Sequence, residues 1–406
     1  MTRPSLHRRR PRAYASLRRG ACLAFAWAIF GVSVLPATLA LAPAVPDQSG
    51  LGAWLQPVQG WYRRYVPAVE ELRPLAPAPL PWQGAWYDVD RNYGRFERWF
   101  ADHLGLRDLM IRGKNELDYR LFRSSSRVYY GRDRELYGRN LSDNELPATE
   151  ALLATPAGQQ AVALGVRRFA QRLRQQGITM VLIPPMEKQY FTRERLPFFA
   201  PRLPADSHFM ALYRRLQADP QLHMIDVWGL LQARQGQFPI FYHQDFHWTD
   251  LMAHTVAAET TNLIARLEGM PLRWRHPLHY RYQPFDGVEA RFSARLNAGE
   301  LVSEPVLTPD WPTRHHQTSY DAAATGLEFE TDTLDDPALL PATCMYGNSF
   351  SDGMLRAGLT EHYRKFVKLD RKMALPPVPA LVAGRCRYLI VQILDIQADR
   401  WQSLTH

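Results

Sequence analysis

The sequence predicts an α/β protein in which helices cover both faces of a mostly parallel sheet, giving a three-layer α/β/α domain. One observation is that helix-like and strand-like segments alternate along residues 155–394. Another is that the strand-like runs are continuously apolar, as expected for strands buried on both faces. The hydrophobic content of 46%, with no internal repeat, is ordinary for a globular protein.

Two helices and a hairpin are predicted before this alternation begins. Apolar residues at 93, 96, 100 and 104 fit one face of a helix that Gly105 ends, and a second helix is predicted over 106–122. The segments 128–130 and 136–137 flank a turn of glycine and charged residues, which indicates a short hairpin.

The alternation itself starts at Thr155-Pro156, a pair typical of a helix start, and the helix that follows has an amphipathic pattern. Gly177 ends this helix, and the apolar run 178–183 predicts a buried strand. Further helices are predicted at 209–216, 249–267 and 354–362, and further strands at 224–227, 343–346 and 388–394. Residues 270–340 break the alternation, so we expect an insertion of loops and short strands that either walls the active site or is purely structural.

The formal net charge of +9 comes mainly from the first twenty residues, which hold seven arginines and no acid. The remainder carries 9 − 7 = +2, so the sequence does not support a basic face that binds nucleic acid. We expect this basic segment, residues 1–20, to stay in the cytoplasm.

An uncharged apolar run follows the arginines and predicts a membrane-targeting segment at residues 21–45. The run is long enough to span a bilayer as a signal anchor, while Ala40-Leu41-Ala42 leaves open a cleaved signal peptide. A proline-rich linker is predicted at 46–85 and the globular domain at 86–406. Because positive residues stay inside, we expect the domain in the periplasm, anchored in the cell inner membrane.

The three cysteines, Cys22, Cys344 and Cys386, do not form a disulfide framework. Cys344 and Cys386 both fall in probable buried strands, where an oxidising compartment would allow them to pair. We expect them instead to be two buried free thiols.

The strongest chemical signal is Gly347-Asn348-Ser349, which lies between a predicted strand and a predicted helix. Glycine and small polar residues suit a sharp turn that exposes a serine hydroxyl at the carboxyl end of a strand, where parallel sheets place their sites. Gly347, Asn348 and the amides that open the helix are candidates for the turn and its oxyanion donors. Taken alone the signal is weak, since Gly-Asn-Ser is also ordinary turn chemistry.

A second signal is Asp245-x-His247, about a hundred residues earlier. On an extended segment these residues share a face, so His247 is a candidate general base for Ser349 and Asp245 the carboxylate that orients it. The plainer alternative is that Asp245 caps the following helix while His247 packs. A zinc site built from His243, Asp245 and His247 is a further alternative, but no fourth ligand is evident and we expect no metal.

Two other residues lie near these motifs. Trp248 is a candidate for stacking on a sugar, although a tryptophan at a helix start is more often part of the core. Lys188, at the end of another strand, is a candidate for lining the same crevice, but we expect it at the surface.

Together these motifs resemble the periplasmic alginate O-acetyltransferases, the AlgJ and AlgX branch of the SGNH-hydrolase-like proteins. The resemblance rests on Asp245-x-His247-Trp248-Thr249 followed by Gly347-x-Ser349-Phe350-Ser351. Further matching segments are 100–107, 130–133 and 183–185, so the resemblance extends over the globular body. The apolar N-terminal segment and the length are more similar to AlgJ.

The resemblance implies an SGNH-hydrolase-like domain with Asp245, His247 and Ser349 as catalytic residues. It implies O-acetylation of an exported polysaccharide such as alginate, with a membrane-bound O-acyltransferase as the partner that supplies acetyl groups. No cofactor is expected, and Asn348 departs from the wider SGNH group, which usually has Asp there. The same triad leaves open an acetyl esterase, and a non-catalytic scaffold of a polysaccharide secretion complex is a further alternative.

Overall fold

The computed structural model describes residues 23–24, 57, 60–71, 73–77, 84–85, 89–103, 106–204, 206–271, 274, 276–296 and 300–405. The chain divides into two compact units, Met1–Phe122 with Ala294–Ala298 and Arg123–Ser293 with Gly299–His406. The predicted membrane segment at 21–45 lies outside the described residues, apart from Leu23 and Ala24. None of the described helices is both long enough and apolar enough to cross a membrane.

The first unit contains two helices where the sequence predicts them. They are α3, Val89–His103, and α4, Arg107–Phe122. The predicted apolar face of α3 is largely exposed, because Tyr93, Phe96 and Phe100 each keep about half of their surface in solvent.

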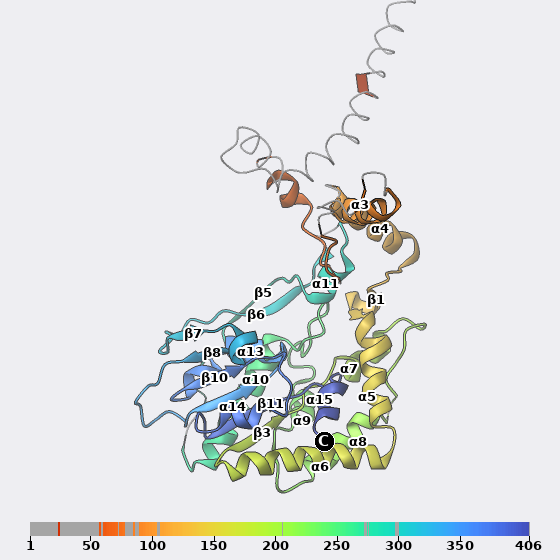
Figure 1. The fold of residues 1–406 in the computed structure, drawn as a ribbon. Helices are drawn as coiled ribbons and strands as arrows, with labels where there is room; N and C mark the ends of the chain where they lie inside the picture. The colour runs from red at the N-terminus through yellow and green to blue at the C-terminus, as the bar shows by residue number, and fades with distance from the viewer. Residues whose placement is uncertain are drawn as a thin grey trace, which may run out of the picture. The chain divides into compact units, whose positions relative to one another are not determined.

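The second unit is built on a seven-stranded sheet with the order β4-β3-β11-β9-β10-β8-β7 (Figure 1). The first five strands of this order run parallel, and β8 and β7 form an antiparallel edge. The strands are β3 (Thr179–Ile183), β4 (His223–Met224), β7 (Gln317–Ser319), β8 (Leu327–Thr331), β9 (Thr343–Tyr346), β10 (Phe366–Leu369) and β11 (Tyr388–Gln392). The predicted, mostly parallel sheet is therefore confirmed.

The helices of the second unit begin and end where local chemistry requires. They are α5 (Leu146–Leu152), α6 (Pro156–Gln175), α7 (Gln189–Thr192), α8 (His208–Gln217), α9 (Val227–Arg234), α10 (Asp250–Leu267), α11 (Val288–Ser293), α12 (Ala322–Thr325), α13 (Phe350–Arg356), α14 (Val378–Val382) and α15 (Ala398–Ser403). The side chain of Thr155 caps α6 and that of Thr249 caps α10 by accepting hydrogen bonds from backbone amides. Gly177 ends α6 with a φ of +76°, a conformation that favours glycine.

Helices cover both faces of the sheet, so this unit has three layers (Figure 1). Alternate residues of a strand point to opposite faces. On β11, Leu389 and Val391 join one apolar core with α6 and α8, while Tyr388 and Ile390 join another with α10 and α13. The strands are thus apolar on both sides, which is why they read as continuous apolar runs.

Two predicted elements differ from the structure. Residues 224–227 are not one strand, because the Asp226 side chain accepts a hydrogen bond from the Gly229 N–H at 3.0 Å and starts α9. The helix predicted at 354–362 begins earlier, at Phe350, and is broken by Gly358, whose φ is +88°. In both places a local cap or a glycine overrides the apolar pattern.

The segment 270–340 contains two kinds of structure. β5 (Tyr280–Pro284) and β6 (Ser303–Leu307) pair with each other in a separate two-stranded sheet. β7 and β8, in contrast, pair with the main sheet and extend its edge. A third pair, β1 (Val128–Tyr130) and β2 (Leu136–Gly138), forms the predicted hairpin.

Cys344 and Cys386 form a disulfide, so the expectation of two free thiols is wrong. Cys344 lies on β9 and Cys386 just before β11, the neighbouring parallel strand. This pairing brings their Cα atoms to 5.8 Å, which lies within the range that a disulfide can bridge.

Candidate active site

Ser349 lies on the turn between β9 and α13, where the sequence analysis expects it. Asn348 shapes this turn, since its Oδ1 accepts from the Phe350 N–H at 3.0 Å and its Nδ2 donates to Gln397 Oε1 at 2.9 Å. The Ser351 hydroxyl donates to the Asn348 carbonyl at 2.6 Å. The turn is therefore held in part by its own side chains and in part by Gln397.

The amides that open α13 are only partly available as oxyanion donors. The Phe350 N–H is bound to the Asn348 side chain, and the N–H groups of Ser351 and Asp352 donate to the carbonyls of Asn348 and Ser349. The Ser349 N–H has no acceptor among the residues that the structure describes. It is thus the amide in this turn that is best placed to bind an oxyanion.

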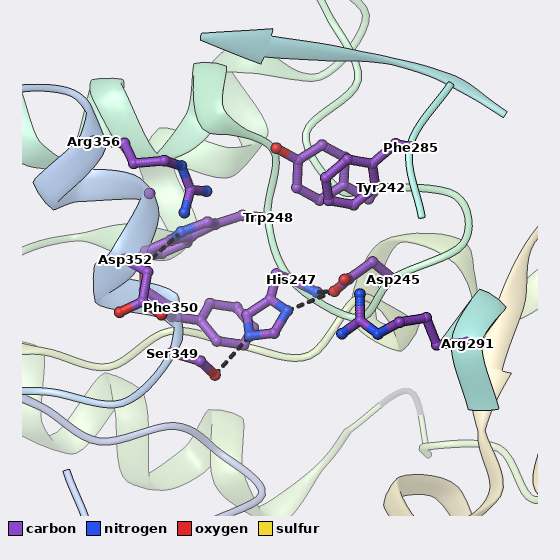
Figure 2. A pocket seen from close by; sticks show the side chains of 11 residues that line it. Tyr242, Asp245, His247, Trp248, Phe285, Arg291, Ser349, Phe350, Asp352 and Arg356 are labelled. Carbon is purple, nitrogen blue, oxygen red and sulfur yellow. Dashed lines mark hydrogen bonds and ion pairs between the residues drawn. The ribbon is translucent and has the colours of Figure 1, made fainter. Parts of the chain in front are cut away.

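The loop before α10 brings the other two predicted residues to Ser349 (Figure 2). His247 Nε2 lies 2.6 Å from Ser349 Oγ, and His247 Nδ1 lies 2.5 Å from Asp245 Oδ1. A carboxylate can only accept, so Nδ1 carries the hydrogen and the neutral ring offers Nε2 as an acceptor for the serine hydroxyl. The three side chains form one hydrogen-bonded chain in the order that serine activation requires.

Asp245 is ionised although it is only 4% exposed. Burial raises the pKa of this carboxyl, but hydrogen bonds from His247 and from the Val288 N–H outweigh burial and lower the pKa below its ordinary value. The Val288 N–H donates to Asp245 Oδ2 at 2.9 Å. The ionised carboxylate fixes the tautomer and the orientation of the imidazole.

Gly287 allows the chain before α11 to approach Asp245 closely. A Cβ atom at this position would lie 2.2 Å from the Gln244 carbonyl oxygen and 2.7 Å from Asp245 Cβ, so any side chain would displace the loop. α11 also buries Glu289, whose carboxyl pKa is raised well above its ordinary value by burial and by the charge of Asp245. Burial and the charge of Asp245 thus both favour the neutral form of this carboxyl.

Two aromatic rings flank the imidazole. The ring centroids of Phe246 and Phe350 lie 4.0 and 4.8 Å from that of His247. Trp248 is almost wholly buried, and its Nε1 donates to the Phe350 carbonyl at 3.0 Å. Trp248 therefore belongs mainly to the core, which is the commoner of the two roles considered for it.

Lys188 is fully buried, so its predicted surface position is wrong. Its Nζ donates to the carbonyls of His243 at 2.9 Å and Tyr242 at 3.3 Å, and it pairs with Glu135 Oε2 at 3.1 Å. These carbonyls belong to residues 239–249, which we call the base loop because they carry the imidazole. The sequence does not predict the buried position of Lys188, because the groups that bind its ammonium come from distant parts of the chain.

The side chains of His243, Asp245 and His247 do not gather around a common point. His243 bonds Glu304, whose Oε1 accepts from the backbone N–H at 2.6 Å and lies 2.9 Å from Nδ1. In the part of the chain that the structure describes, no group of three or more His, Cys, Asp or Glu side chains is arranged to hold a metal ion.

The serine and histidine open on a pocket of about 190 Å³ (Figure 2). The rings of Tyr242 and Phe285 stack with centroids 4.3 Å apart at its wall. The pocket is lined by Tyr242, Asp245, His247, Trp248, Phe285, Arg291, Ser349, Phe350, Asp352, Gly353 and Arg356. Its walls thus combine aromatic surface with two guanidinium groups.

Phe285, Arg291 and Arg356 line the pocket although no sequence motif identified them. Arg356 pairs with the buried Asp250 at 2.6 Å, yet about half of the arginine side chain stays exposed. The separation of Arg356 from Ser349 could have identified it as a pocket residue. A residue seven positions after Ser349 lies on the same side of a helix that starts at the serine. Phe285 and Arg291 come from the segment 270–340, whose sequence has no period that would place them.

A family model described as "ALGX: SGNH hydrolase-like domain, acetyltransferase AlgX" matches residues 145–369, more than half of the chain. The protein named "Probable alginate O-acetylase AlgJ" from Azotobacter vinelandii is 27% identical over 181 residues, which cover 43% of this chain and 44% of that protein. The chain therefore spans less than half the length of this relative.

Two solved structures are similar to this chain at low sequence identity. The O-acetyltransferase domain of Pseudomonas putida AlgJ has a TM-score of 0.43 at 16% identity and covers 69% of this chain and 99% of its own. Bacillus cereus PatB1 has a TM-score of 0.43 at 12% identity, with 67% and 96% covered. The family match includes the residues from Asp245 to Ser349 and confirms the resemblance seen in the motifs. The chain belongs to the SGNH-hydrolase-like acetyltransferase domains of the AlgX family.

Proposed function

We propose that this protein is an O-acetyltransferase that passes acetyl groups through Ser349 to hydroxyls of an exported polysaccharide. The observation that carries the proposal is the hydrogen-bonded chain from Asp245 through His247 to Ser349, which opens on a pocket. Membership of an acetyltransferase family supports the reaction class.

In the first half-reaction, Ser349 Oγ attacks the carbonyl carbon of an acetyl donor while His247 Nε2 takes the hydroxyl proton. Asp245 stabilises the imidazolium without being protonated itself. The carbonyl oxygen becomes an oxyanion, and the Ser349 N–H is the donor that we assign to it. Collapse of the intermediate breaks the bond to the leaving group, which receives the proton from His247, and acetyl-Ser349 remains.

In the second half-reaction, a sugar hydroxyl attacks the acetyl carbon of acetyl-Ser349. His247 Nε2 takes the proton of that hydroxyl and then returns it to Ser349 Oγ as the serine leaves. The product is an O-acetylated sugar, and the enzyme is restored. Water in place of the sugar would give acetate, so a transferase depends on a pocket that favours the sugar.

The pocket walls support an anionic carbohydrate as the acceptor. Tyr242 and Phe285 provide aromatic surface, and Arg291 and Arg356 bring positive charge to the same cavity. Guanidinium groups bind carboxylates well, and the sugar residues of alginate are uronic acids. The relative from Azotobacter vinelandii is named as an alginate O-acetylase. Alginate is therefore the acceptor that we propose first.

We also propose that the enzyme works in the periplasm, tethered by residues 21–45, and receives acetyl groups from a membrane-bound O-acyltransferase. The Cys344–Cys386 disulfide supports an oxidising compartment. The arginines before the apolar segment support this orientation. A reporter fused after residue 85 should be active if it reports the periplasm and silent if it reports the cytoplasm; the reverse pattern would contradict the proposal.

The test of the activity supplies an acetyl donor such as 4-nitrophenyl acetate together with alginate oligosaccharides. We expect acetylated sugar by mass spectrometry, and Ser349→Ala or His247→Ala should lower turnover by several orders of magnitude. Ser403→Ala, which removes a hydroxyl from α15, is the matched control and should keep the parent rate. Acetate release without any acetylated sugar would favour the esterase. Turnover within a few-fold of the parent in both triad variants would favour a scaffold.

A further inference from the structure

Lys368 is a second fully buried lysine, and it lies beneath the turn that carries Ser349. It belongs to β10, which pairs in parallel with β9, the strand that leads into this turn. Its Nζ donates to the carbonyl of Gly347 at 2.8 Å and to that of Leu369 at 3.2 Å. The ammonium group therefore fastens the backbone two residues before the serine.

The same ammonium is connected by charges to the helix that follows the serine. Lys368 Nζ lies 3.5 Å from Glu328 Oε2, on β8. The Arg371 guanidinium binds Glu328 at 2.8 Å and Asp352 at 2.9 Å. Asp352 lies on α13 and lines the pocket. Both sides of the nucleophile turn, residues 347–351, are thus tied to one network of four charged groups.

A buried ammonium is costly to keep, since an apolar side chain of similar size would avoid its desolvation. Burial lowers the pKa of Lys368 to about 8, although the charge of Glu328 opposes this shift. Arg371 lowers the pKa of the lysine further and Asp352 raises it, so these three groups set its charge. Because the Lys368 ammonium is costly to desolvate and lies close to the nucleophile, its presence indicates a role beyond packing.

We propose that Lys368 is a positioning residue for the nucleophile, whose charged Nζ holds the Gly347 carbonyl and so keeps Ser349 Oγ within reach of His247. This inference rests on the proposed function of Ser349. A hydrogen bond from a charged donor is roughly twice as strong as one from a neutral donor, so loss of the proton weakens the support of the turn.

The expected consequence is a pH dependence with a defined sign. The folded-state pKa of Lys368 lies below that of an unfolded lysine, so the folded protein loses this proton first as pH rises through about 8. Reaction at Ser349 should therefore slow above that pH. The lowered pKa also means that deprotonation of Lys368 by itself raises the stability of the folded state relative to the unfolded state over the same rise, so this titration does not itself unfold the protein.

The experiment measures the rate at which phenylmethylsulfonyl fluoride modifies Ser349, and kcat and KM for 4-nitrophenyl acetate, from pH 6 to 9.5. Lys368→Met should slow modification and lower kcat by up to about 100-fold, with KM near the parent value and without the decline above pH 8. Lys365→Met is the matched control, because Lys365 lies just before β10 and its ammonium pairs with Glu330 of β8 at 3.2 Å, not with the turn. It should keep both the rate and the pH profile of the parent.

Glu328→Gln tests the same idea without removing the lysine. The charge of Glu328 raises the pKa of Lys368, so its loss should move the decline in rate to lower pH. Thermal unfolding of each variant at pH 7 identifies any that fail to fold, and the direction of the Glu328→Gln shift remains a test if Lys368→Met does not fold. Parent-like rates in folded Lys368→Met, or an unmoved decline in Glu328→Gln, would overturn the inference. Absence of any modification of Ser349 in the parent would instead overturn the proposed function.

Discussion

The two halves of the site are built in different ways. The nucleophile turn, residues 347–351, joins a strand to a helix, and several of its hydrogen bonds link residues within three positions of each other. Lys368, Gln397 and Trp248 support it from other elements. The base loop has no helix and no strand beyond the single bridge Phe241–Trp248. It has a few hydrogen bonds of its own, and Glu304, Lys188 and Val288 support it from more than forty positions away in the chain.

This difference indicates where each half is vulnerable. The nucleophile turn keeps much of its shape as long as the strand and the helix form, and Lys368 is the distant group on which we propose that it depends. The base loop depends more on the rest of the unit being folded, because Glu304, Lys188 and Val288 support it from other elements. Apart from changes at Lys368, we therefore expect changes near the base loop to affect activity more than changes of similar size near the nucleophile turn.

The largest effect is expected for Asp245→Asn. The amide can accept from either the Val288 N–H or the His247 ring, but it must then place its own N–H₂ against the other donor. The imidazole loses both its orientation and the stabilisation of its charged form, and kcat should fall by about 10³- to 10⁴-fold. Asp321→Asn, at the exposed cap of α12, is the control for the same chemical change. A loss of less than tenfold in Asp245→Asn would show that the carboxylate does not orient the base.

A smaller but still large effect is expected for Gly287→Ala. The added Cβ would overlap the Gln244 carbonyl and the Asp245 side chain, and backbone atoms cannot give way as a flexible side chain can. The shift of Asp245 should lower kcat by up to about 100-fold. Gly94→Ala, with no atom within 4 Å of the new methyl group, should leave kcat unchanged. Equal rates in the two variants would mean that the base loop tolerates displacement.

The same difference explains which features of the fold and the site could be predicted from the sequence and which could not. The three layers were predictable because buried strands and amphipathic helices follow periods that are local in the chain. Ser349 was predictable for a similar reason, since strand, glycine turn and helix follow one another. Lys188 and Glu304 were not, because a buried charge is recognised only by partners that folding brings from elsewhere. The prediction of two free thiols is wrong because the disulfide depends on β9 and β11 being neighbours, and the sequence alone does not show that pairing.

Removal of the disulfide should separate stability from activity. Replacing Cys344 and Cys386 together by alanine frees a loop of about forty residues in the unfolded chain, and the free energy of unfolding should fall by about 2–4 kcal/mol. Because the hydrogen bonds that hold the nucleophile turn do not involve Cys344 or Cys386, kcat at 25 °C should stay within about twofold. Denaturant unfolding and initial rates measure the two effects, with reduced parent protein as an independent comparison. A parallel loss of kcat would show that the turn depends on the distant strand pairing after all.

The smallest effect is expected for Asn348→Asp, the residue that the wider SGNH group usually has. The new carboxylate keeps the hydrogen bond from the Phe350 N–H and is favoured at the start of a helix. Its other oxygen, however, faces Gln397 Oε1, so the amide of Gln397 must turn over to donate. That rotation removes the acceptor that Gln397 offers to the Leu394 N–H at 2.9 Å.

The gain at Phe350 and the loss at Leu394 are of similar size, about 1 kcal/mol each, so kcat should change by only a few-fold in either direction. Gln397→Ala isolates the effect of losing the Gln397 hydrogen bonds, because it removes the partner of Asn348 without adding a charge beside Ser349. If Asn348→Asp changes kcat by more than a hundredfold while Gln397→Ala does not, the charge itself acts on the nucleophile. The turn would then be sensitive to electrostatics and not only to its local hydrogen bonds, and the contrast with the base loop would have to be given up.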